Sequence, residues 1–265
     1  MKTILVTGAA SGIGRAAAVH FAARGYTVIA LDIREMPDEE GIRPFRADVT
    51  DEASLLAVRD TLAAEGVRLD VILSVAGMHR MASFVEGDLA VIRRLIDVNL
   101  LGVIETNRVF HPLLAPHGRV VIVTSEVATY DPLPFNGLYT VSKCALESYA
   151  QALRQELSLL GQTVVTVRPG AVETPLVGGT VAAAEQLERE TVLFRREAVH
   201  FTRLTARFMG TPMKPERLAP VIYRAATARH PRLSYAKHRH AGLVLLSALP
   251  KRLQCALVRL LLRRK

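Results

Sequence analysis

Three residues near the middle of the chain have types and a spacing that could support proton transfer. Tyr139 and Lys143 are four residues apart, so on a helix their side chains project from the same face. A free phenol has a pKa of about 10, and a nearby ammonium group favours the phenolate and lowers that pKa. The pair therefore predicts a tyrosine that accepts or donates a proton near neutral pH.

The third residue, Ser125, follows an apolar run at residues 120–123 that predicts a buried strand. The serine would then lie at the carboxyl end of that strand, where ligands bind in open α/β sheets. For the tyrosine and lysine alone, a surface pair on an ordinary helix is the alternative. The strands and helices predicted around these residues decide whether they form a site for proton transfer or an ordinary surface pair.

The amino-terminal residues predict a phosphate-binding turn. Residues 3–7 have the composition of a strand and residues 15–24 that of a helix, and between them Gly8, Gly12 and Gly14 follow the spacing Gly-x-x-x-Gly-x-Gly. Glycines let the backbone approach a pyrophosphate. The amino terminus of the helix adds unpaired N–H groups and the positive end of its dipole.

A second strand is predicted at residues 27–31 and ends at Asp32. An acidic residue at this place can accept hydrogen bonds from an adenosine ribose and would repel a 2′-phosphate, which favours NAD over NADP. Arg34 could offset part of that charge, so NADP stays open as the alternative. A carboxylate that only caps a loop is the other interpretation of Asp32.

Strand candidates alternate with helical segments along the chain. They lie at residues 3–7, 27–31, 43–47, 70–74, 118–124, 163–168 and 232–236. This alternation predicts a single α/β domain over residues 1–265, of Rossmann type, with a doubly wound, mostly parallel sheet of about seven strands and helices on both faces. No internal repeat, low-complexity tract or linker divides the sequence.

Taken together, these motifs resemble the short-chain dehydrogenase/reductase family from residue 3 to about residue 236. Thr7 to Gly14 matches the family's glycine turn, and Ser74 and Val75 replace the two asparagines that usually precede its Ala-Gly pair. An Asp-Val pair, a helix asparagine and a Pro-Gly segment match as well. The cofactor-binding residues that the resemblance implies are Gly8, Ser11, Gly12, Ile13, Gly14, Asp32, Asp48, Val49, Ala76, Gly77, Asn99, Tyr139, Lys143, Val172 and Thr174.

The resemblance also implies catalytic roles. Tyr139 would be the general acid/base, and Lys143 would lower its pKa and hydrogen-bond the nicotinamide ribose. Ser125 would orient the substrate and stabilise its developing oxyanion, so that Ser125 and Tyr139 contact the substrate. Asn99 would hold a water molecule in line with Lys143 and complete a proton relay. NAD would supply the hydride chemistry.

Residues 175–214 form the segment where this family covers its substrate, and here the segment is long and helical in character. Its apolar candidates for lining a pocket are Leu187, Phe194, Phe201, Leu204, Phe208 and Met209. Met78 and His79 are expected to line the floor, with His79 as a wall or exposed residue rather than a second base. An apolar pocket favours a hydrophobic secondary alcohol or ketone. The resemblance to hydroxysteroid and retinol dehydrogenases implies a steroid, bile-acid or retinoid-like substrate.

The formal net charge is +9, with much of the positive charge late in the chain. No aromatic platform or nucleic-acid motif accompanies it, which argues against a nucleic-acid partner. The tail at about 240–265 has apolar runs shorter than the ~20 residues of a spanning helix. From Leu253 the apolar residues form one face of a basic helix, which can lie in a lipid interface. Packing of this stripe on the protein's own body or on another subunit is the alternative.

Cys144 and Cys255 are far apart and suggest neither a disulfide nor a metal cluster, which favours a reducing compartment. The first residues run directly into the first strand, so the sequence predicts no signal peptide and a cytoplasmic location, with peripheral membrane association as the alternative. The family resemblance implies a homodimer or homotetramer.

The sequence thus supports three functions. The first is an NAD-dependent oxidoreductase that transfers hydride between nicotinamide and a hydrophobic secondary alcohol or ketone. The second is an NADP-dependent carbonyl reductase on the same scaffold. The third is a non-catalytic dinucleotide-binding protein at a membrane surface.

Overall fold

The computed structural model describes residues 2–208, 211–238 and 240–263, apart from the side chains of residues 175–182, 207 and 208. Two of the expected pocket-lining positions, the side chain of Phe208 and the whole of Met209, lie outside the described residues.

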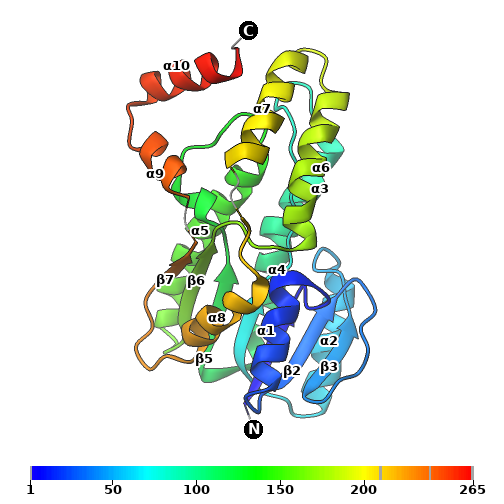
Figure 1. The fold of residues 1–265 in the computed structure, drawn as a ribbon. Helices are drawn as coiled ribbons and strands as arrows, with labels where there is room; N and C mark the ends of the chain where they lie inside the picture. Colours follow the sequence, from blue (N-terminus) through cyan, green and yellow to red (C-terminus); the bar gives the residue numbers. More distant parts are fainter. Residues whose placement is uncertain (1, 209–210, 239, 264–265) are drawn as a thin grey trace.

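The centre of the molecule is a seven-stranded parallel sheet in the order β3-β2-β1-β4-β5-β6-β7 (Figure 1). The strands are β1 (Thr3–Thr7), β2 (Thr27–Asp32), β3 (Ile42–Arg46), β4 (Leu69–Ser74), β5 (Leu114–Val123), β6 (Thr163–Pro169) and β7 (Ser234–Lys237). The predicted α/β class and seven strands are confirmed. The boundaries differ most at β5, which begins before the predicted residue 118 because it includes the irregular residues after a short 3-10 turn.

Helices connect the strands and cover both faces of the sheet. They are α1 (Gly12–Ala22), α2 (Glu52–Ala64), α3 (Leu89–Ile96), α4 (Gly102–Phe110), α5 (Gly137–Ser158), α6 (Pro175–Glu190), α7 (Arg195–Phe208), α8 (Ala219–Thr227), α9 (Ala241–Ser247) and α10 (Lys251–Leu262). A π-helical turn, η1 (Asp97–Leu101), joins α3 to α4, and three 3-10 turns are η2 (His111–Leu113), η3 (Glu126–Thr129) and η4 (Pro215–Arg217).

Alternate residues of each strand point to opposite faces of the sheet, and each face buries its own core. On one face, Val6 and Val28 pack with Phe21 of α1 and Ile222 of α8. The other face packs against α2, α4 and α5 through residues such as Leu5. The strands are apolar on both faces because helices cover both, as expected for a parallel sheet. The two layers fix where the ends of the strands lie.

Helices α6 and α7 extend beyond the carboxyl ends of the strands (Figure 1). Leu187, Phe194, Phe201 and Leu204 belong to a third apolar cluster, together with Phe135. The ring of Phe135 packs against Phe194 and Phe201, with centroids 5.7 and 5.4 Å apart. These apolar residues therefore pack against one another and the loop before α5.

The tail helix α10 packs beside α7 through a face that the sequence did not indicate (Figure 1). Gln254 and Leu262 are buried and Val258 is partly buried, one helical turn apart from each other. The predicted apolar stripe faces away, with Leu253 and Leu260 51% and 57% exposed. Leu253 and Leu260 therefore do not pack on the described body of the protein, and contact of the stripe with another subunit or with lipid stays a prediction. Among the described helices, none combines the length and apolar character that a membrane span requires.

Candidate active site

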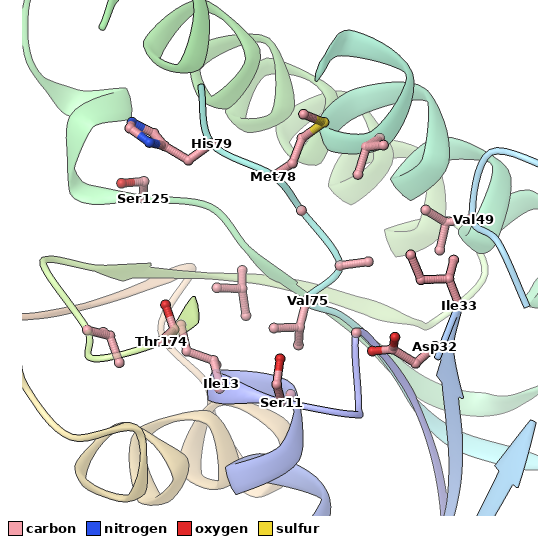
Figure 2. A pocket seen from close by; sticks show the side chains of 18 of the residues that line it. Ser11, Ile13, Asp32, Ile33, Val49, Val75, Met78, His79, Ser125 and Thr174 are labelled. Carbon is pink, nitrogen blue, oxygen red and sulfur yellow. The ribbon is translucent and has the colours of Figure 1, made fainter. Parts of the chain in front are cut away.

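A cavity of about 500 Å³ opens at the carboxyl ends of the strands (Figure 2). It lies around the point where the chain leaves β3 at one edge and enters β4 on the other side of β1, which is the switch point where α/β sheets bind ligands. Every site residue implied by the family resemblance lines this cavity except Asn99, which is fully buried behind it.

The glycine turn brings three backbone segments into close contact. Gly8 has a φ of +69°, which favours glycine, and a Cβ there would lie 3.0 Å from the backbone of Ala76. A Cβ on Gly14 would lie 2.1 Å from the carbonyl oxygen of Gly8. The turn therefore folds tightly onto the start of α1 and beside the end of β4. This is the close backbone approach that a dinucleotide cradle requires.

Thr7 supplies the hydrogen bonds at the end of β4, where the family's asparagines are absent. Its Oγ1 accepts from the backbone N–H groups of Val75 and Ala76, at 3.0 and 3.1 Å. Ser74, by contrast, has a buried hydroxyl without a hydrogen-bond partner in the described part of the chain. The sequence pointed to Thr7 only as part of the glycine turn and gave no signal for this contact.

Asp32 is buried, and both of its carboxylate oxygens accept hydrogen bonds within the protein. Oδ2 accepts from the backbone of Ala10 at 3.0 Å, and Oδ1 accepts from the backbone and Nε of Arg34 at 3.0 and 3.2 Å. These bonds outweigh burial and lower the pKa of Asp32. Arg34 Nη2 also donates to Ser11 Oγ at 2.7 Å. The guanidinium thus lies across the cavity edge where the adenosine end of a dinucleotide is expected.

Asp48 and Val49 form the next part of the wall. Asp48 accepts from the backbone and side chain of Thr50, at 2.8 and 2.7 Å, and from Arg94 Nη2 at 3.1 Å. Val49 packs so closely on α4 that a Cβ on Gly102 would lie 2.7 Å from its Cγ2. Arg94 itself lines the cavity and is a cation at this end that sequence reasoning missed.

Asn99 holds the loop after β4. It lies in the π-helical turn, where its Oδ1 accepts from Met78 N at 2.7 Å. Its Nδ2 donates to the Met78 carbonyl at 2.9 Å and to Ser142 Oγ at 3.1 Å. These direct bonds tie the Ala-Gly turn to α5. The predicted water-holding role of Asn99 stays a prediction.

Tyr139, Lys143 and Ser125 meet at the opposite end of the cavity from Asp32 (Figure 2 shows Ser125 and Asp32). Tyr139 and Lys143 project from one face of α5, and Lys143 Nζ lies 5.8 Å from the centroid of the Tyr139 ring. Lys143 is 4% exposed, and its Nζ donates to the Val123 carbonyl at 3.4 Å. The Ser125 hydroxyl is close enough to Tyr139 to lower the pKa of the phenol. The three side chains that the sequence singled out are therefore neighbours.

The pKa of Tyr139 differs from the expectation. Burial raises the pKa of Tyr139 to about 12, and only the hydrogen bond with Ser125 lowers it. Burial also lowers the pKa of Lys143 to about 8. The expected lowering of the tyrosine pKa by Lys143 is therefore wrong for the protein without bound ligands. Desolvation of the two side chains outweighs the attraction between the phenolate and the ammonium.

An ion pair fixes α5 against the sheet near these residues. Glu147 accepts from Arg168 Nε at 2.8 Å and Nη2 at 2.7 Å, and from Thr124 Oγ1 at 2.6 Å. Thr124 is the residue before Ser125. One carboxylate therefore connects the helix that carries Tyr139 with the ends of β5 and β6, a contact that the sequence did not indicate.

The segment after β6 closes another side of the cavity. Val172 is buried and forms a parallel bridge with Met213, whose N–H donates to the Ala171 carbonyl at 2.9 Å. Thr174 lines the cavity as well. Among the described residues, none after Thr174 lines the cavity, because the apolar side chains of α6 and α7 pack in a cluster of their own. This differs from the expectation that Leu187, Phe194, Phe201 and Leu204 line the pocket.

His79 is more closely integrated into the site than the sequence indicated. Its ring packs edge-on against Tyr139, with centroids 4.8 Å apart, and its Nε2 lies 2.9 Å from Oδ1 of Asn136. Asn136 immediately precedes α5 and was not identified from the sequence. Burial lowers the pKa of His79, which favours the neutral ring. Met78 and His79 both line the cavity, as expected.

Neither a metal centre nor a disulfide emerges from the residues described here. No three His, Cys, Asp or Glu side chains among them are grouped to hold a metal ion. Cys144 and Cys255 are both free.

Comparison with known proteins identifies the family. Residues 2–185 match the family model described as short chain dehydrogenase. The match covers more than half of the chain, and the chain therefore belongs to the short-chain dehydrogenase family.

The relatives of this chain include a reductase and a dehydrogenase. The chain is 34% identical over 182 residues to NADPH-dependent 1-acyldihydroxyacetone phosphate reductase of Schizosaccharomyces pombe, covering 66% of this chain and 61% of that protein. It is 31% identical over 266 residues to estradiol 17-beta-dehydrogenase 2 of Rattus norvegicus, covering 90% of this chain and 68% of that protein. The chain thus spans less than two thirds of the yeast relative.

A solved structure agrees with the fold. A short-chain dehydrogenase from Streptomyces avermitilis superposes with a TM-score of 0.73 at 26% identity, covering 98% of this chain and 94% of that one.

Proposed function

We propose that this protein is an NAD-dependent oxidoreductase that transfers hydride between nicotinamide and a hydrophobic secondary alcohol or ketone. The observation that carries the proposal is the meeting of Ser125, Tyr139 and Lys143 at one end of a cavity whose other end is a glycine cradle. Such an arrangement can hold a dinucleotide along its length and a substrate oxygen beside the tyrosine.

The residues of the cavity fit a dinucleotide. The tight turn at Gly8 and Gly14 leaves no room for a Cβ and offers the N–H groups of α1 to a pyrophosphate. Gly77 leaves space at the end of β4, because a Cβ there would lie only 3.3 Å from Asn99 Oδ1. Val172 and Thr174 would contact the nicotinamide end, and Asp32, Asp48 and Val49 the adenosine end. When bound, the nicotinamide accepts or supplies the hydride.

The protein's own side chains move the proton. In reduction, Tyr139 donates its phenolic proton to the carbonyl oxygen of the substrate as hydride reaches the carbon. In oxidation, Tyr139 accepts the hydroxyl proton. Its raised pKa makes the neutral phenol the stable form at pH 7, so Tyr139 is ready to donate. Ser125 lowers the cost of the phenolate and stabilises the negative charge that develops on the substrate oxygen.

The choice of cofactor depends on Asp32 and Arg34. Asp32 supports NAD, because a buried carboxylate would repel a 2′-phosphate. The NADPH-dependent yeast relative and the position of Arg34 support the alternative, an NADP-dependent carbonyl reductase on the same scaffold. We favour NAD because Arg34 is already paired with Asp32 and Ser11.

The rat relative, named as an estradiol dehydrogenase, supports a steroid-like substrate; bile acids and retinoids belong to the same class of hydrophobic rings. We propose that residues 175–214 act as a substrate lid. Glu86 anchors the corner between α6 and α7, where its carboxylate accepts hydrogen bonds from Val192 N at 2.9 Å and Leu193 N at 2.8 Å.

We also propose that the tail makes peripheral contact with a membrane. The exposed leucines of α10 lie on a helix that carries exposed basic residues, including Arg252 and Arg259, a combination that favours an anionic lipid surface. A non-catalytic protein at a membrane surface is less well supported, because the chain retains both Tyr139 and Lys143. A cytoplasmic location stays a prediction of the sequence.

We further propose a homodimer or homotetramer joined through α4 and α5. Leu101 and Val141 are exposed apolar residues in this region, at 50% and 46%. They are suited to an interface between copies of the chain.

The test is a panel of hydrophobic secondary alcohols, including hydroxysteroids, assayed with NAD and with NADP by the absorbance of the reduced cofactor. We expect turnover with NAD, and we expect Tyr139→Phe to lower kcat by about 10²–10⁴-fold because the proton acceptor is lost. Calorimetric affinity for NAD should change little in the variant. Equal turnover by the variant would contradict the acid/base role, and tighter binding of NADP would favour the alternative.

A further inference from the structure

The residue that follows Ser125 is a buried acid in contact with the tail of the chain. This residue, Glu126, is 7% exposed. Its Oε2 accepts hydrogen bonds from the backbone N–H of His240 at 2.7 Å and from the Tyr130 hydroxyl at 3.1 Å. A buried carboxyl group is costly unless donors satisfy it. The backbone of the tail therefore helps to keep Glu126 in its place.

The chain at the end of β7 also packs against Gly170, which lines the cavity together with Ser125. The N–H of Gly170 donates to the Lys237 carbonyl at 2.9 Å. A Cβ on Gly170 would lie 1.8 Å from the His238 carbonyl oxygen and 2.9 Å from Oε1 of Glu126. The start of the tail is therefore in direct contact with the segments that carry Ser125 and Gly170.

The tail contacts the far end of the same loop at Asp131. The backbone N–H of Asp131 donates to Ser247 Oγ at 3.1 Å. Its carboxylate pairs with Lys251 and accepts from Gln254 Nε2 at 2.7 Å, and Gln254 is itself 7% exposed. Residues 125–131 are thus held by the tail at both ends.

Ser125 needs support from outside its own loop. It is followed only by the 3-10 turn η3, and such short turns have poor hydrogen-bond geometry. Ser125 Oγ accepts from Val127 N at 3.3 Å, which is longer than a typical bond of this kind. On the preceding side, Glu147 binds Thr124. On the following side, the contact from another part of the chain is that of the tail with Glu126.

We infer that Glu126 and Asp131 are positioning residues for Ser125, and that residues 240–254 of the tail supply the contacts through which they act. The inference rests on the proposed function. Ser125 must lie within hydrogen-bond reach of the substrate oxygen while charge develops there. A misplacement of about 1 Å can lower turnover by about 10²-fold. The glycine turn that would hold NAD is fixed by other contacts, so loss of the tail contacts should lower kcat and leave NAD affinity unchanged.

The first experiment changes the tail itself. Ser247→Ala combined with Gln254→Leu removes the hydroxyl and the amide that bind Asp131. With NAD and the best alcohol of the panel, we expect kcat to fall at least about tenfold, while calorimetric affinity for NAD stays within about twofold. Hydrogen exchange of the amides in residues 125–131 should become faster, because their anchor is weaker.

The matched control is Ser158→Ala combined with Gln162→Leu. Gln162 is 8% exposed, and its Nε2 donates to the Ala115 carbonyl at 3.1 Å. Neither Ser158 nor Gln162 lines the cavity. The control therefore removes a serine and a buried glutamine of the same kinds without touching the loop of Ser125, and kcat should not change.

The second experiment compares Glu126→Leu with Glu126→Gln. Leucine has no acceptor for His240 N, whereas the amide oxygen of glutamine can accept and should retain most of the turnover. In Glu126→Leu the low-pH limb of kcat for alcohol oxidation should also move to higher pH. Ser125 lowers the pKa of Tyr139, so a displaced Ser125 leaves a phenol that is harder to deprotonate.

Unchanged kcat in the tail variant of a protein that oxidises alcohols would overturn the inference. A fall in kcat that the control variant shares, or that comes with an equal loss of NAD affinity, would do the same, because it would indicate general destabilisation. Failure of the proposed function looks different, since then the unmodified protein oxidises no alcohol, and the inference fails with it.

Discussion

At the scale of single residues, the most informative pair is Tyr139 and Lys143. Lys143 is buried and Tyr139 is partly buried, and desolvation moves their pKa values in opposite directions, to about 12 for the phenol and about 8 for the amine. The protein thus holds both groups in environments that disfavour their charged forms. Catalytic side chains often have such unfavourable environments, which lower the stability of the folded protein.

Lys143→Met should therefore stabilise the protein while it removes activity. The pKa of Lys143 falls from 10.5 to about 8, which at about 1.36 kcal/mol per unit corresponds to a penalty of up to about 3 kcal/mol. Below pH 8 the lysine is protonated in both the folded and the unfolded chain, so the whole penalty applies. It decreases between about pH 8 and 10.5 and is absent above.

Thermal and denaturant unfolding at several pH values would measure this gain in the free energy of unfolding. Lys214→Met is the control, because Lys214 is exposed. A loss of stability in Lys143→Met at pH 7 would show that the contact of Nζ with the Val123 carbonyl outweighs desolvation.

At the scale of elements, the turn between β1 and α1 determines where a dinucleotide can lie. Its backbone approaches that of β4, and Thr7 hydrogen-bonds the N–H groups of Val75 and Ala76. Helix α5 is fixed in a comparable way through Glu147 and Arg168. Two ends of one cavity are thus held by separate contacts to the same sheet.

Gly14→Ala should lower both NAD affinity and stability. The new Cβ would lie 2.1 Å from the carbonyl oxygen of Gly8, and that backbone atom cannot move without opening the turn. We expect at least about a tenfold loss of NAD affinity by calorimetry, because the N–H groups of α1 would no longer converge on the pyrophosphate. Val19→Ala, at an exposed position of the same helix, is the control. Unchanged NAD binding in Gly14→Ala would disprove the predicted cradle.

At the scale of the whole molecule, the tail gives the protein an apolar and basic surface on α10, beside α7. Lys251 and Gln254 pair with Asp131, and Gln254 Nε2 lies 2.7 Å from Asp131 Oδ2. These contacts anchor the start of α10 and turn Leu253 and Leu260 outward.

Replacing Leu253 and Leu260 together by Gln should weaken binding to vesicles that contain anionic lipid. Co-sedimentation with phosphatidylcholine vesicles with and without phosphatidylserine would measure it, and we expect binding to need the anionic lipid because the helix is basic. Leu159→Gln with Leu160→Gln is the matched control, since these leucines are 86% and 58% exposed at the end of α5. Equal loss of binding in both double variants, or no binding by the unmodified protein, would contradict the membrane proposal.

Local patterns were sufficient to predict the sheet and much of the cavity. Apolar runs of strand length and the glycine spacing depend on neighbouring residues, so the strands and the β1–α1 turn could be read from the sequence. The i, i+4 spacing likewise placed Tyr139 and Lys143 on one face of α5. Arg94, Asn136 and Glu147 could not be found in this way, because each acts through a partner far away in the sequence.

By itself, the sequence determined the fold, the glycine turn and the identity of the Ser, Tyr and Lys at the carboxyl ends of the strands. Only the tertiary structure decided the desolvation of Tyr139 and Lys143, the packing of His79 on Tyr139 and the outward direction of the α10 stripe. Residue types and spacing specify local geometry. Desolvation and hydrogen-bond satisfaction depend on every group packed around an atom, and those groups come together only when the chain folds.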